Sequence, residues 1–587
     1  MKATKKLIVQ SAVFLLIAAI AIICCVMVGG SRKKAPAASA VALNDGTFLG
    51  KGEGRNGPIT VSVTVAGGKV KSAEIVEEQE TPAIGGPVEE SAIESFVKSG
   101  GNTASIDAVS GATLTWNGMV AALDAAMAAA RGEAVAATGS EDTTADIVVI
   151  GAGGAGLTAA TEAASQGKKV IVLEKMGIVG GNTNSATGGL NASETVVQKK
   201  LGIADTNDQF FADTMKGGHN KNDEALVRTM VENSAAIVDW LQSPIVGADL
   251  SDVGIMGGST NKRTHRPTGG QAVGTHLVPK LYEAAQRAGA DVRLNNAVTD
   301  IIEEGGKAAG VKVSAEGGDY IIKAKAVIIA TGGFGANPTL IGKYRPELKD
   351  FPTTNTKGAT GDAFVWIEKF GGQLNLMNEI QTHPTVVPGR GLLITEAVRG
   401  NGAIMVSHAG KRFINELDTR DVTSKAVLAL PERRAYIFFN EDVRKSLKAI
   451  EGYVKAGLLT IGDSVEDIAG KLNMDAAVLK ATLDTYNAAQ ASGTDAEFGR
   501  ADMARSLANG PYYAVEIEPA IHHTMGGIVI NTKAEVVKSD GTAVPGLYAA
   551  GEVTGGVHGD NRLGGNAIAD ITIYGKIAAD SALAYIK

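Results

Sequence analysis

The stretch "DIVVIGAGGAGLTAATEAASQGKKVIVLEK" at Asp146–Lys175 decides the fold. It reads as a buried strand (Ile147–Ile150), a turn with Gly151, Gly153 and Gly156, a helix, and a second strand that ends at Glu174. In such a unit the glycines give a tight turn, a close backbone approach to a pyrophosphate, and close helix–strand packing. The acidic residue accepts a hydrogen bond from a ribose hydroxyl. The order of these parts predicts a dinucleotide-binding βαβ unit.

Two later stretches discriminate between the dinucleotides that share this fingerprint. "KAVIIATGGFG" (325–335) and "GLYAAGEVTGG" (546–556) each read as a strand that enters a glycine turn. In flavoproteins with a split FAD domain, segments from late in the chain add strands and turns to the same nucleotide-binding domain. The sequence holds no second fingerprint for a nicotinamide. It therefore predicts non-covalent FAD.

Composition excludes several other classes. The 587 residues are 44% hydrophobic and 20% charged, which is typical of a folded protein of three or four domains. The net charge of −7, without a basic block in the folded part, argues against nucleic acid as a partner. The two cysteines, Cys24 and Cys25, are adjacent near the N-terminus, so the folded domains have no disulfide, c-type haem or iron–sulfur ligands. Redox chemistry here needs an organic cofactor.

The N-terminus carries an apolar run, Ala12–Val28, with lysines or arginines on both sides. With its flanks it approaches the length that spans a bilayer, which favours an uncleaved membrane anchor. A signal peptide cleaved near "AASA" (37–40) is the alternative. Both interpretations place the large domains outside the cytoplasm.

Further motifs resemble a known family. "VGGNTNSATGG", "HPT…ITEAVRGNGAI", "RFINELDTRD", "HHTMGG", "LYAAGEVTGGVHG" and "NRLGGNAI" together resemble the soluble fumarate reductases of the flavocytochrome c type, within the fumarate reductase/succinate dehydrogenase flavoproteins. The resemblance covers about Asp146–Lys587. The haem domain of these proteins is missing here. Residues 47–130 show alternation and then an Ala-rich helix ("NGMVAALDAAMAAARG"), and they resemble instead the FMN-binding domain of flavinylated reductases.

The resemblance implies an α/β fold with a split FAD-binding Rossmann-like domain, an inserted α+β capping domain and a small α+β FMN-binding domain. A transmembrane helix or signal would precede them. The predicted segments are an anchor or signal (1–34), a tether (35–46), the FMN-binding domain (47–131), a linker (132–145), the FAD-binding domain (146–378 and 524–587) and the capping domain (379–523). We expect the capping domain to be mobile and to close over substrate.

"DAVSGATLTW" (107–116) matches the pattern Asp-x-x-Ser/Thr-Gly-Ala-Thr, through Asp107, Ser110, Gly111, Ala112 and Thr113. In domains of this kind a flavin transferase links FMN to the threonine through a phosphoester bond, which implies covalent FMN on Thr113. A helix N-cap at Ser110 or Thr113 is the structural alternative.

Reduction of an activated alkene needs hydride at one carbon, a proton at the other, and cationic groups that hold carboxylates. Candidates for these tasks occur in glycine-rich stretches: His383, Thr395, Glu396, Arg399, Arg420, His522, His523 and Arg562. For each of these residues a purely structural role is the alternative, such as an i,i+3 ion pair between Glu396 and Arg399 on a helix.

The resemblance assigns roles to these residues. His383 and Thr395 would hold one carboxylate of a dicarboxylate, and His522 and Arg562 the other. Arg420 would deliver the proton, resupplied through Glu396 and Arg399. One departure is Leu393, where the fumarate enzymes usually have methionine; the two side chains are similar in volume.

The resemblance also implies cofactor and cation contacts. The expected FAD-binding residues are Gly151, Gly153, Gly154, Ala155, Gly156, Glu174, Gly181, Asn182, Thr183, Gly188, Gly189, Ala330, Thr331, Gly332, Gly551, Glu552, Asn566, Ala567 and Ile568. A structural sodium ion would lie near Thr524, Met525, Gly526, Glu552 and Thr554, with no catalytic metal.

The sequence thus predicts an extracytoplasmic fumarate reductase that takes electrons from a membrane-bound donor through FMN to FAD. A reductase of another unsaturated acid, such as urocanate, an acrylate or a cinnamate, is the nearest alternative. A flavin electron-carrier module is the alternative from another class.

Overall fold

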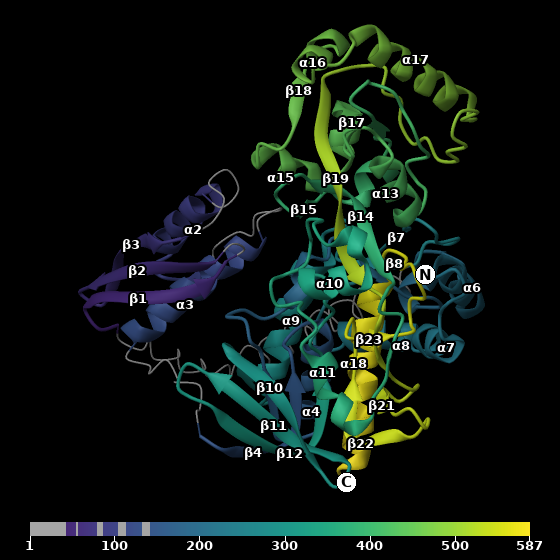
Figure 1. The fold of residues 1–587 in the computed structure, drawn as a ribbon. Helices are drawn as coiled ribbons and strands as arrows, with labels where there is room; N and C mark the ends of the chain where they lie inside the picture. Colours follow the sequence, from purple (N-terminus) through teal and green to yellow (C-terminus); the bar gives the residue numbers. More distant parts are fainter. Residues whose placement is uncertain (1–42, 55–56, 79–85, 104–112, 132–140) are drawn as a thin grey trace, which may run out of the picture.

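The computed structural model describes residues 43–54, 57–78, 86–103, 113–131 and 141–587, which build three bodies with separate hydrophobic cores (Figure 1). The predicted anchor at 1–34 and most of the predicted tether lie outside the described residues. Among the described helices, none is both long enough and apolar enough to cross a membrane.

The small N-terminal body is an antiparallel sheet, β1-β2-β3, covered by two helices. Its elements are β1 (Gly46–Glu53), β2 (Pro58–Ala66), β3 (Lys69–Glu77), α2 (Gly86–Lys98) and α3 (Thr113–Ala130). The alternation in β2 buries Ile59, Val61, Val63 and Val65 against the helices. Helix α3 starts at Thr113, four residues before the Ala-rich run that predicted it. The motif residues Asp107, Ser110, Gly111 and Ala112 lie outside the described residues.

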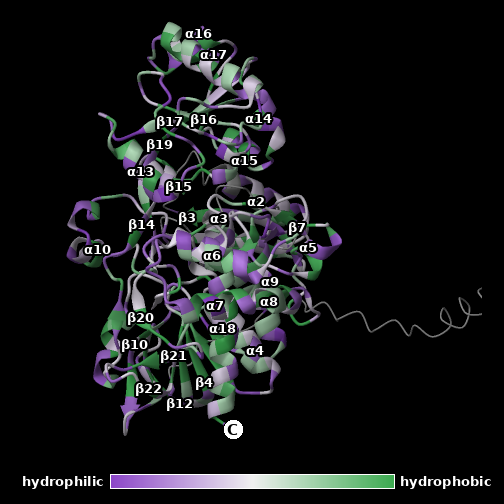
Figure 2. Cartoon of the chain, turned by 90° about the vertical axis from the view of Figure 1, so that its right-hand side faces the viewer, coloured by the Kyte–Doolittle hydropathy of each residue, from purple (hydrophilic) through white to green (hydrophobic). Residues whose placement is uncertain are grey.

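The large body is built on a parallel sheet in the order β22-β12-β4-β5-β9, extended by antiparallel β10, β11 and β21. The strands are β4 (Thr143–Ile150), β5 (Val170–Leu173), β9 (Asp291–Arg293), β10 (Asn296–Glu304), β11 (Lys307–Ala315), β12 (Tyr320–Ile329), β21 (Glu535–Val537) and β22 (Ala543–Ala549). Figure 2 shows β4 and β12 side by side in hydrophobic colours, as expected for strands that are covered on both faces.

Strand β4 begins at Thr143, inside the predicted linker and before the predicted start at Ile147. Thr143 and Thr144 pair with Ile322 and Lys323 of β12. The start of this strand is polar and has no strand period, so the sequence does not predict it. It is a strand because β12, far along the chain, supplies its hydrogen-bond partners.

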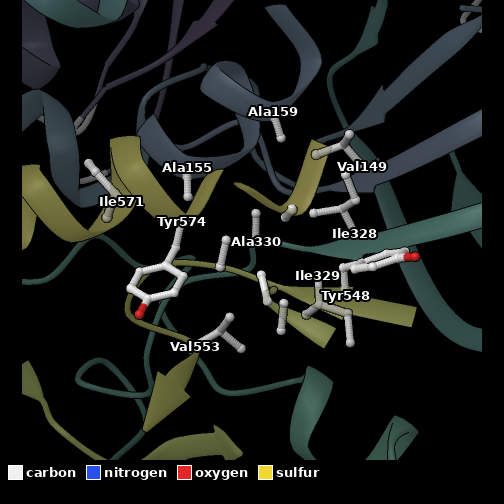
Figure 3. Packing of buried hydrophobic residues seen from close by; sticks show 14 of the residues in the cluster. Val149, Ala155, Ala159, Ile328, Ile329, Ala330, Tyr548, Val553, Ile571 and Tyr574 are labelled. Carbon is white, nitrogen blue, oxygen red and sulfur yellow. The ribbon is translucent and has the colours of Figure 1, made fainter. Parts of the chain in front are cut away.

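Two helices cover the start of this sheet. Helix α4 (Gly154–Ser165) follows β4, and α18 (Asn566–Tyr585) packs against it from the far end of the chain. Figure 3 shows Ala155 of α4, Ile571 of α18 and Ala330, which follows β12, in one cluster of buried hydrophobic residues. Small side chains on α4 let the two helices and the sheet approach closely.

The remaining elements of the large body are η2 (Gly181–Ser185), β6 (Leu190–Asn191), α5 (Val196–Lys200), α6 (Asn207–Gly217), α7 (Glu224–Glu232), α8 (Ser234–Gln242), β7 (Asp252–Gly254), β8 (Thr264–Arg266), α9 (Val273–Arg287), α10 (Pro338–Tyr344), η3 (Pro346–Leu348), α11 (Ala363–Trp366), η4 (Glu368–Phe370), β13 (Leu374–Asn375), β20 (Gly527–Val529) and β23 (Thr554–Gly555).

The third body is inserted between β13 and β20 and is drawn in green at the top of Figure 1. Its sheet has the order β15-β14-β19-β17-β16, with β18 beside β19. The elements are β14 (Ile380–Val387), β15 (Leu392–Leu393), α12 (Glu396–Gly400), β16 (Ile404–Val406), α13 (Arg420–Leu428), β17 (Ala435–Asn440), α14 (Glu441–Ser446), α15 (Ala449–Lys455), β18 (Thr460–Gly462), α16 (Val465–Lys471), α17 (Ala476–Ser492) and β19 (Tyr512–Thr524). The chain enters along β14 and leaves along β19, and these two strands pair with each other.

Candidate active site

The βαβ unit borders a cavity of about 310 Å³. Of the residues expected to bind the nucleotide, the cavity is lined by Gly151, Gly153, Gly154, Ala155, Glu174, Gly181, Asn182, Thr183, Ala330, Thr331, Gly332 and Glu552. They come from the ends of β4, β5, β12 and β22, from the first turn of α4 and from η2, all at the carboxyl edge of the parallel sheet. This is the edge at which doubly wound folds bind nucleotides.

The local chemistry of the cavity fits a dinucleotide. Helix α4 begins after Gly153 without a side-chain N-cap, which suits an anion at its N-terminus. The Gly154 N–H donates to Thr183 Oγ1 at 3.2 Å, so η2 holds this end of the helix. A Cβ at Gly156 would lie 1.9 Å from the carbonyl oxygen of Gly151, so glycine is needed for the close turn. The hydroxyl of Thr331 borders the cavity, is buried, and has no partner among the described residues.

Besides the predicted ribose contact, Glu174 makes structural hydrogen bonds to the backbone. Its carboxylate accepts hydrogen bonds of 2.9 Å from the backbone N–H groups of Ala152 and Met176. Burial raises the pKa of Glu174, and these hydrogen bonds oppose the rise. The side chain therefore joins β5 to the glycine turn and keeps lone pairs directed at the cavity.

Seven expected contacts do not border the cavity: Gly156, Gly188, Gly189, Gly551, Asn566, Ala567 and Ile568. Gly156 acts through packing, as described. Asn566 accepts a hydrogen bond from Asn191 at 2.7 Å at the start of α18.

Sequence reasoning missed a loop at 353–359 that lines the cavity, together with Lys175 and Asp362. Asn182 ties η2 to this loop, since its side chain donates to Asn355 Oδ1 at 2.6 Å and accepts from the Thr356 N–H at 2.8 Å. The polar run "TTNTKGATGD" (353–362) was the available signal.

A second group of side chains meets where β14 and β19 cross from the inserted body into the large body. The register shifts twice here: Gln381 pairs with His523 and Thr382 with Ile521, and a further shift lies between His383 and Val386. Such bulges re-aim side chains. His522 is left without a partner in the ladder, and its ring centroid lies 5.0 Å from that of His383.

Glu396 is the centre of the predicted proton relay. Arg420 Nε donates to Glu396 Oε1 at 2.5 Å, and Arg399 Nη2 lies 3.9 Å from the same oxygen. The expected i,i+3 pair of α12 is therefore present and is part of the larger cluster. His383 Nε2 lies 3.6 Å from Glu396 Oε1.

The other two expected substrate ligands lie at element ends. Thr395 is the N-cap of α12, where its oxygen accepts from the Ala397 N–H, so its own hydroxyl hydrogen remains available as a donor. Arg562 follows the glycine loop before α18; its Nη1 donates to the Leu563 carbonyl at 3.0 Å, and its buried Nε has no partner among the described residues.

Gln381 links these groups and was not predicted. Its amide donates to the Arg562 carbonyl at 2.9 Å and accepts from Arg420 Nη1 at 3.1 Å. It lies two residues before His383 on β14, so the period of two along a strand was the signal that could have found it. Thr354, also missed, lies 2.8 Å from His522 Nδ1 through its hydroxyl.

The site carries an excess of positive charge. Burial lowers the pKa of His383, His522 and His523 well below the usual range, and the charges of nearby arginines lower it further. Burial and the charge of Arg420 lower the pKa of Arg562 to about 9, although neighbouring carboxylates oppose this. Glu396 shows the reverse: burial alone would raise its pKa, but Arg420 and Arg399 hold it at about 2.

The residues expected at a cation are adjacent to both sites. Glu552 Oε1 accepts from the Thr524 N–H at 3.0 Å, and Thr554 donates to the Gly551 carbonyl at 2.8 Å. Within the described ranges no group of three or more His, Cys, Asp or Glu side chains has the arrangement of a metal site.

Comparison with known proteins agrees with this geometry. The FAD binding domain family matches residues 146–568, and the FMN-binding domain family matches residues 54–128. A fumarate reductase (cytochrome) of Shewanella frigidimarina is 46% identical over 78% of this chain and 80% of its own. A urocanate reductase of Eggerthella lenta is 33% identical over 92% of both chains. The open conformation of a flavocytochrome c3 fumarate reductase matches with a TM-score of 0.67 and 43% identity, over 78% of this chain and 80% of that one.

Fold, cavity and comparisons define the class: an FAD-dependent oxidoreductase acting on CH–CH groups. The chain belongs to the fumarate reductase flavoprotein family of the flavocytochrome c type, with an FMN-binding domain ahead of the FAD-binding domain. The resemblance and the two flavin cofactors predicted from the sequence are thereby confirmed.

Proposed function

We propose that the protein reduces fumarate to succinate. The observation that carries this proposal is the charge of the second site. Arg399 and Arg420 lie beside Glu396. Arg562 forms no ion pair with a described carboxylate, and burial keeps the neighbouring histidines neutral. Buried surplus charge is costly unless it is paired. A dicarboxylate would supply negative charge to Arg562 and to the arginines that share Glu396.

The clamp residues would hold the two carboxylates as the sequence suggested, His383 and Thr395 one, His522 and Arg562 the other. Bound FAD would supply the hydride to one alkene carbon. Arg420 would give a proton to the other carbon, since its bonds to Glu396 and Gln381 use Nε and Nη1 and leave Nη2 for substrate.

Resupply of that proton would run from Arg399 through Glu396 to Arg420. Glu396 is ionised: burial would raise its pKa, but the charge of Arg420 is the largest cause that holds it at about 2. Once Arg420 has given up its proton, that cause is gone and Glu396 becomes a stronger proton acceptor. Burial lowers the pKa of Arg399, which makes it a better donor than a solvated arginine. Glu396 Oε1 lies 2.5 Å from Arg420 Nε and 3.9 Å from Arg399 Nη2, so a small displacement of Arg399 would complete the path.

Electrons would reach FAD from FMN on Thr113, which a flavin transferase would attach and a membrane donor would reduce. Gly54, at the end of β1, borders the FAD cavity. Gly52 of β1 packs against Gly118 of α3, and Gly50 packs against Ala126, so residue 54 lies towards the end of α3 where Thr113 is. This packing supports a direct path from the small domain to the cavity.

We also propose that the N-terminal apolar run anchors the protein, with its domains outside the cytoplasm. Protease treatment of intact spheroplasts should degrade the folded domains while a cytoplasmic marker survives. Protection of the domains until lysis would contradict this placement.

The function is tested by anaerobic oxidation of reduced viologen with purified, flavin-loaded protein, offering fumarate and urocanate separately. Fast turnover with fumarate, lost in Arg420→Ala while bound FAD is retained, is the expected result. No fumarate turnover by fully loaded wild type would refute the proposal.

A reductase of another unsaturated acid remains the second candidate, because the similarity to the urocanate reductase extends over the FMN-binding region as well. A substrate with one carboxylate would leave part of the positive charge unpaired, so we rank it second. Turnover with urocanate and not with fumarate would establish it.

A further inference from the structure

A buried ion cluster, which the reaction proposed above does not use, bonds to both the guanidinium and the backbone carbonyl of Arg399. Its Nη1 donates to the carbonyl oxygen of Glu416 at 2.6 Å. Its own carbonyl oxygen accepts from Arg500 Nη2 at 2.6 Å. Arg500 and Glu416 pair with each other at 3.0 Å. The guanidinium and the backbone of Arg399 are thus tied to one ion pair.

Glu416 is the centre of this cluster. Its carboxylate accepts from Arg412 Nε at 2.8 Å, from Arg412 Nη2 at 2.9 Å and from the Met405 N–H at 3.2 Å. Arg412 continues to Asp495 at 2.9 Å. The four charged side chains are at most 2% exposed. Because burying ions offsets most of their mutual attraction, such a cluster is weak evidence for a stabilising role.

We propose that Glu416 and Arg500 are positioning residues that hold Arg399 within reach of Glu396, so that the proton given up by Arg420 is replaced. This inference rests on the proposed function. Arg399 Nη2 is 3.9 Å from Glu396 Oε1, which is longer than a hydrogen bond, so a small displacement decides whether the path closes. The buried Nε of Arg399 has no partner among the described residues, which leaves the two ends as its fixed points.

The cluster also acts through charge. Burial lowers the pKa of Arg399; Glu396 and Glu416 raise it, and Arg420 and Arg500 lower it. Without the charge of Glu416, the pKa of Arg399 falls further. Replacement of the Arg420 proton needs protonated Arg399. The pH above which kcat falls, the alkaline limb of its pH profile, should therefore move to lower pH.

The test compares Glu416→Gln with Asp495→Asn in the flavin-loaded protein. Both changes remove one buried carboxylate charge that pairs with Arg412, but only the Glu416 carboxylate also pairs with the guanidinium of Arg500, which holds the Arg399 carbonyl. For Glu416→Gln we expect kcat for fumarate to fall about 10- to 100-fold, as for a misplaced catalytic group, with an alkaline limb at lower pH. Succinate affinity, measured by equilibrium dialysis, stays within about threefold, because uniform binding is untouched. Asp495→Asn keeps the kcat and the pH profile of the wild type.

Equal losses in both variants, or an unmoved alkaline limb in Glu416→Gln, would overturn the inference. If Glu416→Gln does not fold, Arg500→Lys provides the same comparison, because lysine keeps the charge and cannot make all the hydrogen bonds of Arg500. A wild type that is inactive on fumarate would refute the proposed function instead, which separates the two failures.

Discussion

At the scale of single residues, Arg562 combines a full charge with nearly complete burial, and that combination predicts a pH limit. Its pKa is lowered to about 9, by burial first and by Arg420 next. A dicarboxylate binds the protonated guanidinium, so kcat/KM for fumarate should be constant below this value and fall above it. Steady-state kinetics between about pH 6 and 10.5 would measure the limb.

Arg562→Lys provides the control for this prediction. The ordinary pKa of lysine is about 2 units lower than that of arginine, so the same surroundings should move the limb to lower pH by about as much. A limb at the same pH in both proteins would mean that another group causes it.

Thr113 carries a separate prediction. Thr113→Ala should abolish covalent FMN while FAD binding and viologen-driven fumarate reduction remain, because viologen reduces FAD directly. In-gel flavin fluorescence after denaturation measures the covalent cofactor. Thr115→Ala is the matched control in the same helix and should keep it. Covalent flavin in Thr113→Ala would refute the attachment site.

At the scale of elements, the turn from β4 into α4 depends on one missing side chain. In Gly156→Ala the new Cβ would collide with the Gly151 carbonyl oxygen at 1.9 Å, so α4 must shift from the strand and its amides leave the cavity. We expect purified Gly156→Ala to hold little FAD, as judged by its flavin absorbance.

Gly470→Ala is the matched control, because it makes the same substitution at a position where the added Cβ meets no other atom. Gly470 lies within α16, and a Cβ added there would have no neighbouring atom within 4 Å. Gly470→Ala should keep full FAD and gain up to about 1 kcal/mol of helix stability. Equal FAD content in the two variants would contradict the role of Gly156.

The same turn explains how far the sequence could predict the molecule. The βαβ unit is contiguous, and its spacing predicts both strands and the helix. The loop at 353–359 and the side chain of Gln381 reach their sites through tertiary contacts. The polar run and the strand period mark them as candidates, but neither pattern shows which site they join. The bulge at His522 depends on the pairing of β14 with β19, which lie far apart in the sequence. The sequence therefore could not predict the directions in which His383 and His522 point.

At the scale of the whole molecule, the neutral histidine group predicts sensitivity to acid. The folded-state pKa values of His383, His522 and His523 lie well below the unfolded value of 6.5, so unfolding takes up protons below about pH 6.5. The free energy of unfolding should therefore fall with decreasing pH, by up to about 1.4 kcal/mol per pH unit for each histidine.

Thermal unfolding midpoints of the FAD-loaded protein between about pH 8 and 5 test this slope. His383→Asn removes one of these titrating groups and should reduce the slope, while His265 and His276, whose pKa burial also lowers, keep their contribution. A midpoint that is flat between about pH 7 and 5.5 would show that these histidines are protonated or exposed in the folded protein.

The late position of β22 has a consequence for biosynthesis. Val327 of β12 pairs with Leu547 of β22, and α18, which covers the same sheet, follows still later. A ribosome adding about 5 to 20 residues per second needs about 10 to 45 s to make the intervening chain. During that time the apolar edge of β12 is exposed, and the cavity for FAD is incomplete. FAD can therefore enter its complete cavity only after the C-terminal strand and helix have been made.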